Sequence, residues 1–201
     1  MALTKATNRM IEGASINVLD YGAVGDSNIE TGGGTDDTAA FNLAIAASIA
    51  EGKYLYAPSG YVFRITSALD MRGVRGMNLE GKIYADSITG SPAVTIGGFS
   101  NGSSESFHFN EIHDGVSRLG PSPADALLRV FGMKNSDLRI RGCRYIQIYS
   151  DSTVTGGSSN AYNQFHLGHA HKLELKGEDS SSWNTENVFY GGRLTTLYIG
   201  T

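Results

Sequence analysis

The amino-acid sequence predicts an all-β solenoid that begins with one short α-helix. Three observations lead there. Glycine is abundant, with 26 residues in 201 against an average near 7%, and only 4 prolines accompany it. Beyond residue 67 the chain reads as short alternating apolar and polar runs separated by glycine-containing turns, which is typical of strands. Part of this region repeats at a fixed offset of about 24 residues, which lies in the range of solenoid repeats.

Composition and charge exclude several classes of protein. Lys and Arg number 16 against 20 Asp and Glu, for a net charge of -4, so nucleic acid is not expected as a partner. Cys143 is the one cysteine, which excludes an internal disulfide framework, and we expect it to be a small buried thiol. The sequence contains neither an apolar signal-peptide core nor a run long enough to span a bilayer.

The first element in chain order is a polar arm over residues 1–16, which is too short to fold alone and either frays or orders against a partner. A helix follows the glycine run 32–34. Thr35 or Asp36 can cap it, and Asp36 and Asp37 place negative charge at the positive end of its dipole. Gly52 is the expected C-terminal stop.

The helix is predicted to be amphipathic and to cover one end of the β-structure. Its expected apolar stripe consists of Phe41, Ile45 and Ile49, widened by Leu43 and Ala44. The stretch KYLYAPSGYVFRI that follows predicts a strand, a turn and a second strand. Residues 17–66 therefore form a capping unit, and residues 67–201 form the coils.

The repeat is clearest near the end of the chain. Asn163-Gln-Phe165 matches Asn187-Val-Phe189, and Leu173-Glu-Leu175 matches Leu197-Tyr-Ile199. Further upstream, Val130 and Leu138-Arg-Ile140 keep the internal spacing of Phe165 and Leu173-Glu-Leu175, which suggests an earlier copy with a longer insertion between the copies. A hairpin sandwich is the competing interpretation, but Asn101-Gly102 lies in a polar loop and not in a tight turn. The repeat favours the solenoid.

At this point the first third of the chain resembles a known family. The phrases LDYGAVGD, TDDTAAFNLAIAA and YLYAPSGYVFRI resemble the start of pectate-lyase-like right-handed parallel β-helices. More narrowly, TKATNRMIEGASINVLDYGA looks like the N-terminal region of phage tailspike and capsular depolymerase proteins. The resemblance is specific over residues 4–65, and phrases such as NTENVFYGGR resemble later coils of the same proteins.

The resemblance implies a homotrimer on a virion, with an arm, a plugging helix and coils that bind or cleave a bacterial surface polysaccharide. The arm would attach to a phage tail or baseplate protein through Thr4, Lys5, Asn8, Arg9, Met10 and Ile11. Synthesis in the host cytoplasm without a signal peptide, no membrane insertion and no cofactor are further expectations. Because the sequence ends at LTTLYIGT, within an expected coil, we also expect either a longer spike whose depolymerase site lies outside this segment or a short adaptor that another component caps.

Candidate catalytic residues are carboxylates on the coils, because glycoside cleavage normally uses a pair of them. The candidates are Glu174, Asp151 and Glu186. Strand alternation places Lys172, Glu174 and Lys176 outward, with Tyr198 stacked on Glu174 and Tyr190 stacked on His166. Such an outer stripe suits a sugar-binding groove and equally suits a solvated β-face.

Candidate polysaccharide-binding residues are Trp183, Tyr190, Arg193 and Tyr198. Trp183 is expected in a polar loop between coils, where it either stacks on a sugar or packs across a trimer interface. His166, His169 and His171 raise the possibility of zinc, but the sequence positions no third ligand, so no metal site is predicted. The glycines near residues 22–34 fit no phosphate-binding motif, and the aspartates there fit helix capping and Asx-turns better than calcium.

Three functions follow from these observations. The leading one is a phage tailspike or tail-fibre component directed at a host polysaccharide. The first alternative is a free-standing polysaccharide lyase or glycoside hydrolase. The second alternative is a structural adaptor on which another spike docks.

Overall fold

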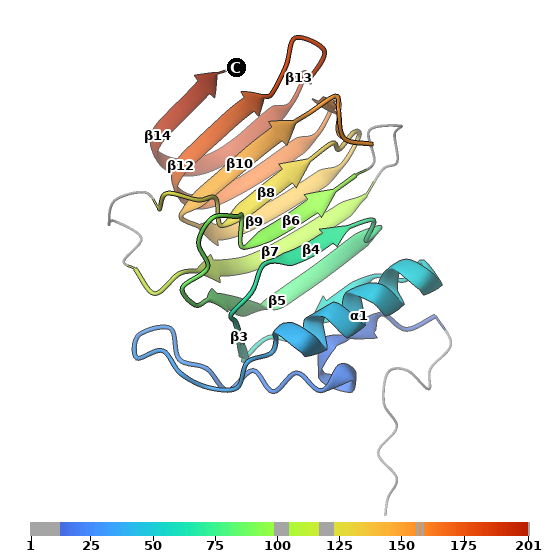
Figure 1. The fold of residues 1–201 in the computed structure, drawn as a ribbon, viewed down its shortest axis with the longest axis vertical. Coiled ribbons are helices and arrows are strands. Elements are labelled where there is room, and N and C mark those ends of the chain that lie inside the picture. The colour runs from blue at the N-terminus through green and yellow to red at the C-terminus, as the bar shows by residue number, and fades with distance from the viewer. Residues whose placement is uncertain (1–12, 99–104, 117–122, 156, 158, 201) are drawn as a thin grey trace, which may run out of the picture.

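The computed structural model describes residues 13–98, 105–116, 123–155, 157 and 159–200 (Figure 1). It confirms the predicted solenoid, since the chain forms a parallel β-helix of about 4 turns with one α-helix. The elements are β1 (Ile16–Asn17), the 3-10 helix η2 (Val18–Tyr21), α1 (Thr38–Glu51), β2 (Leu55–Ala57), β3 (Val62–Ile65), β4 (Leu69–Arg72), β5 (Gly76–Ala85), β6 (Val94–Gly97), β7 (Ser106–His113), β8 (Leu128–Phe131), β9 (Asp137–Cys143), β10 (Tyr145–Ser150), β11 (Ser159–Ala161), β12 (Gln164–Gly177), β13 (Trp183–Thr185) and β14 (Val188–Gly200).

The coils have two long sides, which are joined where β12 bends. The first side contains β2, β5, β7, β9 and the first half of β12, and the second contains β4, β6, β8, β10 and the second half of β12. β14 follows β12 around the bend and pairs with it along both sides. β3 pairs with the second half of β5, and β11 pairs with β13 in a small separate sheet. Each pair is parallel because every strand meets the equivalent strand of the next coil.

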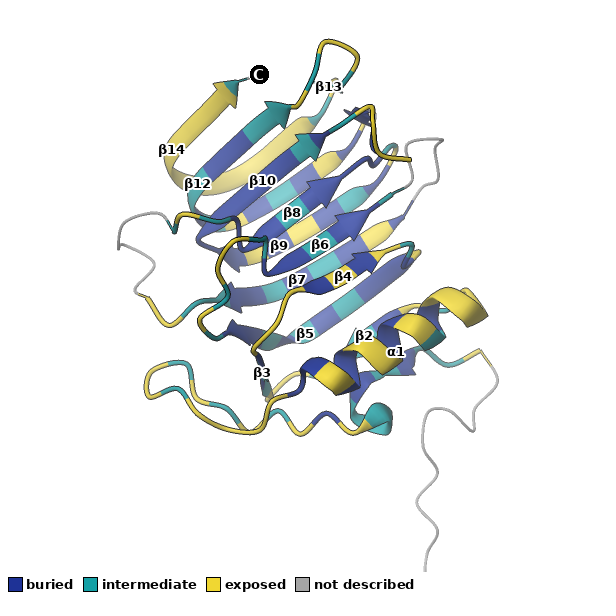
Figure 2. Cartoon of the chain, viewed as in Figure 1, coloured by how far each residue is buried: buried dark blue, intermediate teal, exposed yellow. Residues whose placement is uncertain are grey.

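The core consists of inward-facing residues that stack from coil to coil (Figure 2). One column contains Phe107, Leu138 and Phe165, which are register partners in successive strands and are all fully buried. Phe189 continues the column, with its ring 4.9 Å from that of Phe165 and nearly parallel to it. Burying a side chain of this size contributes about 2–3 kcal/mol, so each coil is stabilised largely by its neighbours.

Helix α1 covers the N-terminal end of the coils, as predicted (Figure 1). Phe41 is fully buried and its ring meets that of Phe63 edge to face at 5.4 Å. The predicted apolar stripe is partly wrong: Ala44 and Ile45 are buried, but Leu43 and Ile49 are 59% and 44% exposed. The buried side of the helix instead includes Ala40 and Ser48, because small residues let the helix lie close to the coils.

The start of α1 uses its polar residues differently from the prediction. Thr35 does not cap the helix, since its backbone N–H and hydroxyl both donate to Asp26. Asp36 accepts the first-turn N–H of Thr38 at 3.0 Å. Asp37 occupies the N-cap position, but its carboxylate accepts backbone N–H groups of Val24 and Gly25 at 2.6 and 3.2 Å. The carboxylate of Asp37 therefore ties the preceding loop to the helix, and burial raises its pKa.

The register confirms the 24-residue repeat of the last two coils and corrects its upstream extension. Phe165 lies beside Phe189 and Leu173 beside Leu197, as predicted. Leu138, however, is the partner of Phe165, whereas Val130 pairs with Ile148. The match of Val130 to Phe165 was wrong because the two residues lie on different sides of the β-helix. The two segments have equal spacing in the sequence, but each of them crosses a different corner of its coil.

Asparagines hold the turns between the last coils together. Asn163 is fully buried, accepts the N–H of Ser136 at 3.0 Å, and donates to the carbonyl of Met133 and to Asn187 Oδ1. Asn160 forms the equivalent contact with Asn184 at 2.8 Å. The repeated asparagine in the two sequence phrases therefore marks a structural ladder.

Two smaller expectations concern single features. Cys143 is buried and unpaired with any other thiol, as predicted. Within the described ranges, no helix has the length and apolar character needed to cross a membrane. The proposed attachment residues Thr4, Lys5, Asn8, Arg9, Met10 and Ile11 lie outside the described residues.

Candidate functional site

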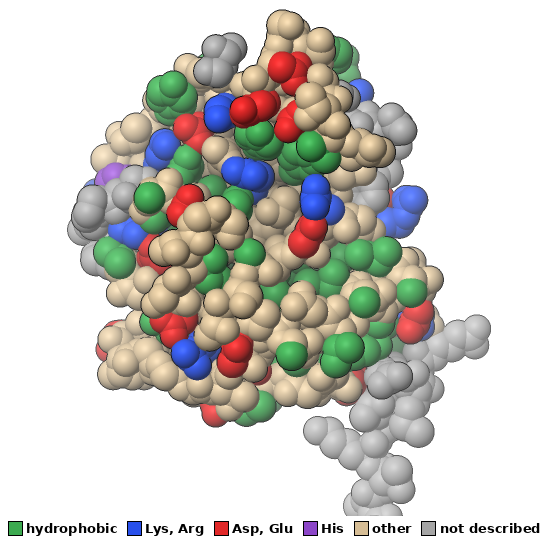
Figure 3. Space-filling view, in the orientation of Figure 1, with side chains coloured by type: hydrophobic (Ala, Val, Ile, Leu, Met, Phe, Trp, Pro, Cys, Tyr) green, Lys and Arg blue, Asp and Glu red, His purple; other side chains and the backbone are tan. Residues whose placement is uncertain are grey.

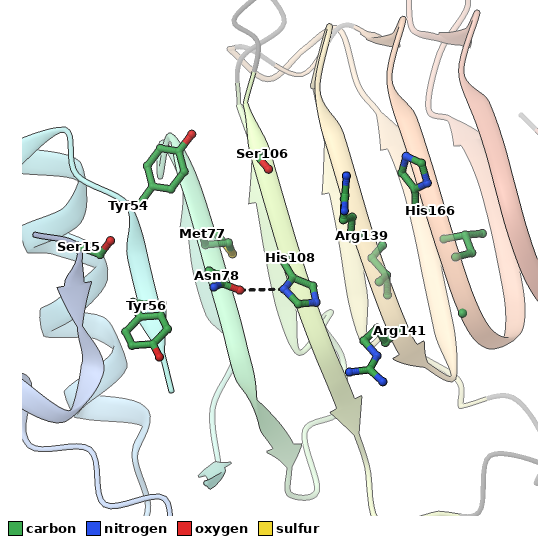
Figure 4. Close-up of a pocket in the computed structure, with 13 residues that line it drawn as sticks. Ser15, Tyr54, Tyr56, Met77, Asn78, Ser106, His108, Arg139, Arg141 and His166 are labelled. Atoms are coloured by element: carbon green, nitrogen blue, oxygen red, sulfur yellow. Dashed lines mark hydrogen bonds between the residues drawn. The ribbon is translucent and has the colours of Figure 1, made fainter. Parts of the chain in front are cut away.

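A large hollow lies on the outer surface of the first side of the coils (Figure 4). Its volume is about 1100 Å³. It crosses β2, β5, β7, β9 and the first half of β12, so it runs across the strands and not along them. The residues that line it are Ser15, Tyr54, Tyr56, Met77, Asn78, Ser106, His108, Arg139, Ile140, Arg141, His166, Leu167 and Gly168. We call this hollow the groove.

A ladder of outward side chains forms the floor of the groove and continues one coil beyond it to Tyr190. Its members are register partners in successive coils: Tyr56, Asn78, His108, Arg139, His166 and Tyr190. From Tyr56 to His166, each ladder residue lies between two buried residues that point into the core, whereas the two neighbours of Tyr190 are exposed. With strands about 4.8 Å apart, the ladder extends over roughly 24 Å. Those dimensions suit an extended chain molecule.

The protonation of His108 can be deduced from its neighbours. Asn78 Nδ2 donates to Glu80 Oε1 at 2.9 Å, which orients Asn78 Oδ1 toward His108 Nδ1 at 2.8 Å. His108 Nδ1 must then carry the proton, and Nε2 keeps a lone pair that can accept a hydrogen bond from a ligand. Burial lowers the pKa of His108, and the nearby Arg141 and Arg139 add to this against the opposing charge of Glu80. The imidazole is therefore neutral near pH 7.

Two guanidinium groups on β9 lie next to His108. Arg139 and Arg141 share the outer surface of that strand, and both are exposed. Among the described residues, the ion-pair contact of Arg139 is a long one, 3.5 Å to Asp137. Arg141 forms no ion pair with any of the described residues. His166 Nε2 is 3.8 Å from Asp137 Oδ1. The middle of the groove is therefore its most cationic part.

Aromatic rings lie at one end of the groove and one coil beyond its other end. Tyr54 is 46% exposed and lies with Tyr56 near the first coil (Figure 4). Burial raises the pKa of Tyr56, helped by the charge of Glu80 and a hydrogen bond to it. Tyr190 stacks on His166 at 4.8 Å, nearly parallel. Aromatic rings with a polar tip suit ligands that have both apolar faces and hydroxyl groups.

The second side of the coils contains a different polar cluster, which includes Glu174. Gln147 Nε2 donates to Glu174 Oε2 at 2.6 Å, and the hydroxyl of Tyr145 donates to the same oxygen. Lys172 Nζ is 3.0 Å from the Tyr145 hydroxyl and 3.3 Å from Glu174 Oε1. Figure 3 views this side and shows basic and acidic side chains next to each other on its upper part.

Glu174 is ionised and enclosed. Its side chain is outward, as predicted, yet the residue is only 8% exposed. Burial acts to raise the pKa of Glu174, but hydrogen bonds from Tyr145 and Gln147 and the charge of Lys172 together lower it. Arg129 donates to Gln147 at 2.6 Å and extends the cluster. A carboxylate with these partners orders the surface and is poorly placed to donate a proton to a glycosidic oxygen.

The structure places the other predicted catalytic carboxylates in turns. Asp151 Oδ1 accepts the backbone N–H and the hydroxyl of Thr153 at 2.9 and 2.6 Å, as in an Asx-turn. Glu186 has a φ of 53° and bonds the hydroxyl of Tyr162. Both side chains therefore have local structural partners, and neither lines the groove.

The predicted sugar-binding residues divide between separate surfaces. Tyr190 lies at the end of the ladder, one coil beyond the groove. Tyr198 lies on the second side, where its ring centre is 5.8 Å from Lys172 Nζ. Both predicted stackings are confirmed, since Tyr198 pairs with Glu174 and Tyr190 with His166. The bend in β12 places the two pairs on different surfaces. Trp183 is 49% exposed, but it starts β13 and does not lie in a loop.

Arg193 and the histidines of HLGHAH complete the predicted set. Arg193 pairs in register with His169 at the bend. His171 donates its backbone N–H to the carbonyl of Arg144 just beyond the bend. Across the described parts of the chain, no three His, Cys, Asp or Glu residues are grouped so as to hold a metal ion.

Most groove residues were missed from the sequence, although a signal was present. The triplets LYA, MNL, FHF, LRI and FHL each place one outward residue between two apolar ones. The offset between stacked ladder partners varies, from 22 residues to 30, 31, 27 and then 24, and this variation hides the alignment.

No protein-family model, curated protein or solved structure matches this chain.

Proposed function

We propose that this chain is a component of a phage tailspike or tail fibre whose β-helix binds a bacterial surface polysaccharide. The observation that carries the proposal is the groove. It presents hydrogen-bonding and aromatic side chains in a row across successive coils, as an extended glycan chain would require. The resemblance of residues 4–65 to tailspike proteins supports the assignment to a virion.

The proposal includes an assembly. The arm over residues 1–16 attaches the protein to a tail or baseplate protein, and three copies associate along their coils. The protein is made in the host cytoplasm and functions on the virion. The β-helix is compatible with such a spike because its stacked coils form a rigid rod.

A binding experiment tests the polysaccharide part. Purified chain is mixed with surface polysaccharides extracted from a panel of bacterial strains, and complexes are detected by affinity electrophoresis. We expect retardation by a subset of strains and reduced retardation for Tyr56→Ala, which removes one aromatic ring of the groove. Equal mobility with and without every polysaccharide would refute glycan binding.

A second experiment tests the virion part. Antibodies raised against this chain should label the tails of phage particles that carry its gene when examined by immuno-electron microscopy. Particles without label would reject virion attachment whatever the result of the glycan experiment.

Polysaccharide cleavage is a second candidate function. The observation that favours it is the Tyr145 hydroxyl, which contacts both Lys172 and Glu174 on the outer surface. Cleavage would release new reducing ends, and an eliminative reaction would also produce unsaturated uronate. Glu174→Gln and Tyr145→Phe should abolish such release. A wild-type chain that releases neither product from polysaccharides it binds would leave binding as its function.

A further inference from the structure

We infer that the groove selects a polysaccharide bearing acidic groups, with Arg139 and Arg141 binding its carboxylates or phosphates. The inference rests on the proposed glycan-binding function and specifies the class of glycan. It concerns the first side of the coils and is independent of the Glu174 cluster on the second side.

The first argument is the charge of the groove. Its lining includes two arginines and two histidines, and no Asp or Glu is among the lining residues. The whole chain, in contrast, has a net charge of -4. An acidic protein repels a polyanion at long range, so binding of one would require a local cationic site of this kind.

The second argument is the availability of the guanidinium groups. On the second side of the coils, Arg72 binds both oxygens of Asp70. Arg139, in contrast, reaches an acidic partner among the described residues only at 3.5 Å, in Asp137, and its side chain is 63% exposed. Arg141 forms no ion pair within the described part of the chain. A guanidinium group presents several donors in a plane that matches a carboxylate or phosphate.

The third argument is the arrangement of the neighbouring groups. His108 presents Nε2 as an acceptor beside the arginines, which suits a hydroxyl group of a sugar. Tyr56 and Tyr190 offer ring surfaces at either end of the same ladder. One row therefore contains an acceptor for a sugar hydroxyl, donors for an anion, and aromatic rings. This combination fits an acidic sugar chain better than it fits an isolated anion.

Matched polymers test the inference. The probes are polygalacturonate, its fully methyl-esterified form, polysialic acid and a single-stranded DNA, each titrated against the whole chain by affinity electrophoresis at low and moderate salt. The esterified polymer has the same sugars without the charge. We expect at least one acidic polysaccharide to bind about tenfold more tightly than the esterified polymer, which corresponds to one charge-assisted contact.

Variants locate the site. Arg139→Gln and Arg141→Gln should each weaken binding of the acidic polymer about tenfold and leave that of the esterified polymer unchanged. Both side chains are exposed, so the variants should keep the wild-type circular dichroism. Lys176→Gln on the second side removes the same charge and should bind as the wild type does.

Four results would overturn the inference. Equal binding of the acidic and esterified polymers would leave glycan binding standing without the acidic preference. Binding of neither acidic polysaccharide would reject the preference directly. Tighter binding of DNA than of either polysaccharide would show a nucleic-acid surface. Loss of binding in Lys176→Gln, but not in the arginine variants, would place the site on the second side.

Discussion

The buried asparagine of the last coils provides the most direct test of how the solenoid is held together. Asn163→Ala removes three side-chain hydrogen bonds, to the N–H of Ser136, the carbonyl of Met133 and the amide of Asn187. The residue is fully buried, so water cannot replace these contacts. At roughly 1 kcal/mol for each bond, the free energy of unfolding should fall by about 3 kcal/mol.

Asn187→Ala is the matched control. It also removes three hydrogen bonds, two to Asn163 and one to the carbonyl of Asn160. Asn187 is partly exposed, so water can take over some of these contacts, and we expect a loss of about 1 kcal/mol.

Urea denaturation measures both variants. Circular dichroism reports the coils, and the fluorescence of the single tryptophan, Trp183, reports the nearby β13 strand. Coincident and reversible transitions are needed for the two free energies to be compared. If Asn163→Ala costs no more than Asn187→Ala, burial does not set the strength of the asparagine ladder and our reasoning is wrong.

Three further predictions address single residues. Burial raises the pKa of Cys143 to about 12, so a thiol reagent such as Ellman's should react only after unfolding, and rapid reaction of the native protein would contradict this. Burial lowers the pKa of His108, so its stabilising contribution is complete above the unfolded value near 6.5 and is lost as pH falls below it. NMR titration of the imidazole should give a pKa below 6.5, and a value above it would refute the assigned environment. Gly168→Ala would place a Cβ atom 2.1 Å from the carbonyl oxygen of Arg141, so we expect a loss of about 2–3 kcal/mol in urea denaturation, and an unchanged midpoint would contradict it.

The sequence predicted the class of fold because two periodicities were visible. The alternation of apolar and polar residues indicated strands, and the 24-residue repeat indicated stacked coils. The helix was predicted from its spacing, yet Leu43 and Ile49 were placed on its buried side. Spacing alone does not show how closely a helix approaches the structure beneath it, and here small residues make the closest contacts.

The groove was largely beyond sequence analysis. His108 and Arg139 are neighbours only because their strands pair, and the pairing depends on turns of different length. The bend at Gly168 then places residues of one strand, such as His166 and Glu174, on different surfaces. Alternation predicts that both point outward, but it cannot predict a corner between them.

The ladder also has a consequence for how such a protein could diversify. Each ladder side chain from Tyr56 to His166 is flanked by two core residues that hold its coil, and the variable turns leave the stacking unchanged. A substitution at His108 or Arg139 therefore changes what is displayed at one position without disturbing the column beneath. Substitutions in one coil at a time can thus change which ligand is recognised while the core residues stay the same. Relatives with the same architecture could therefore recognise unrelated surfaces.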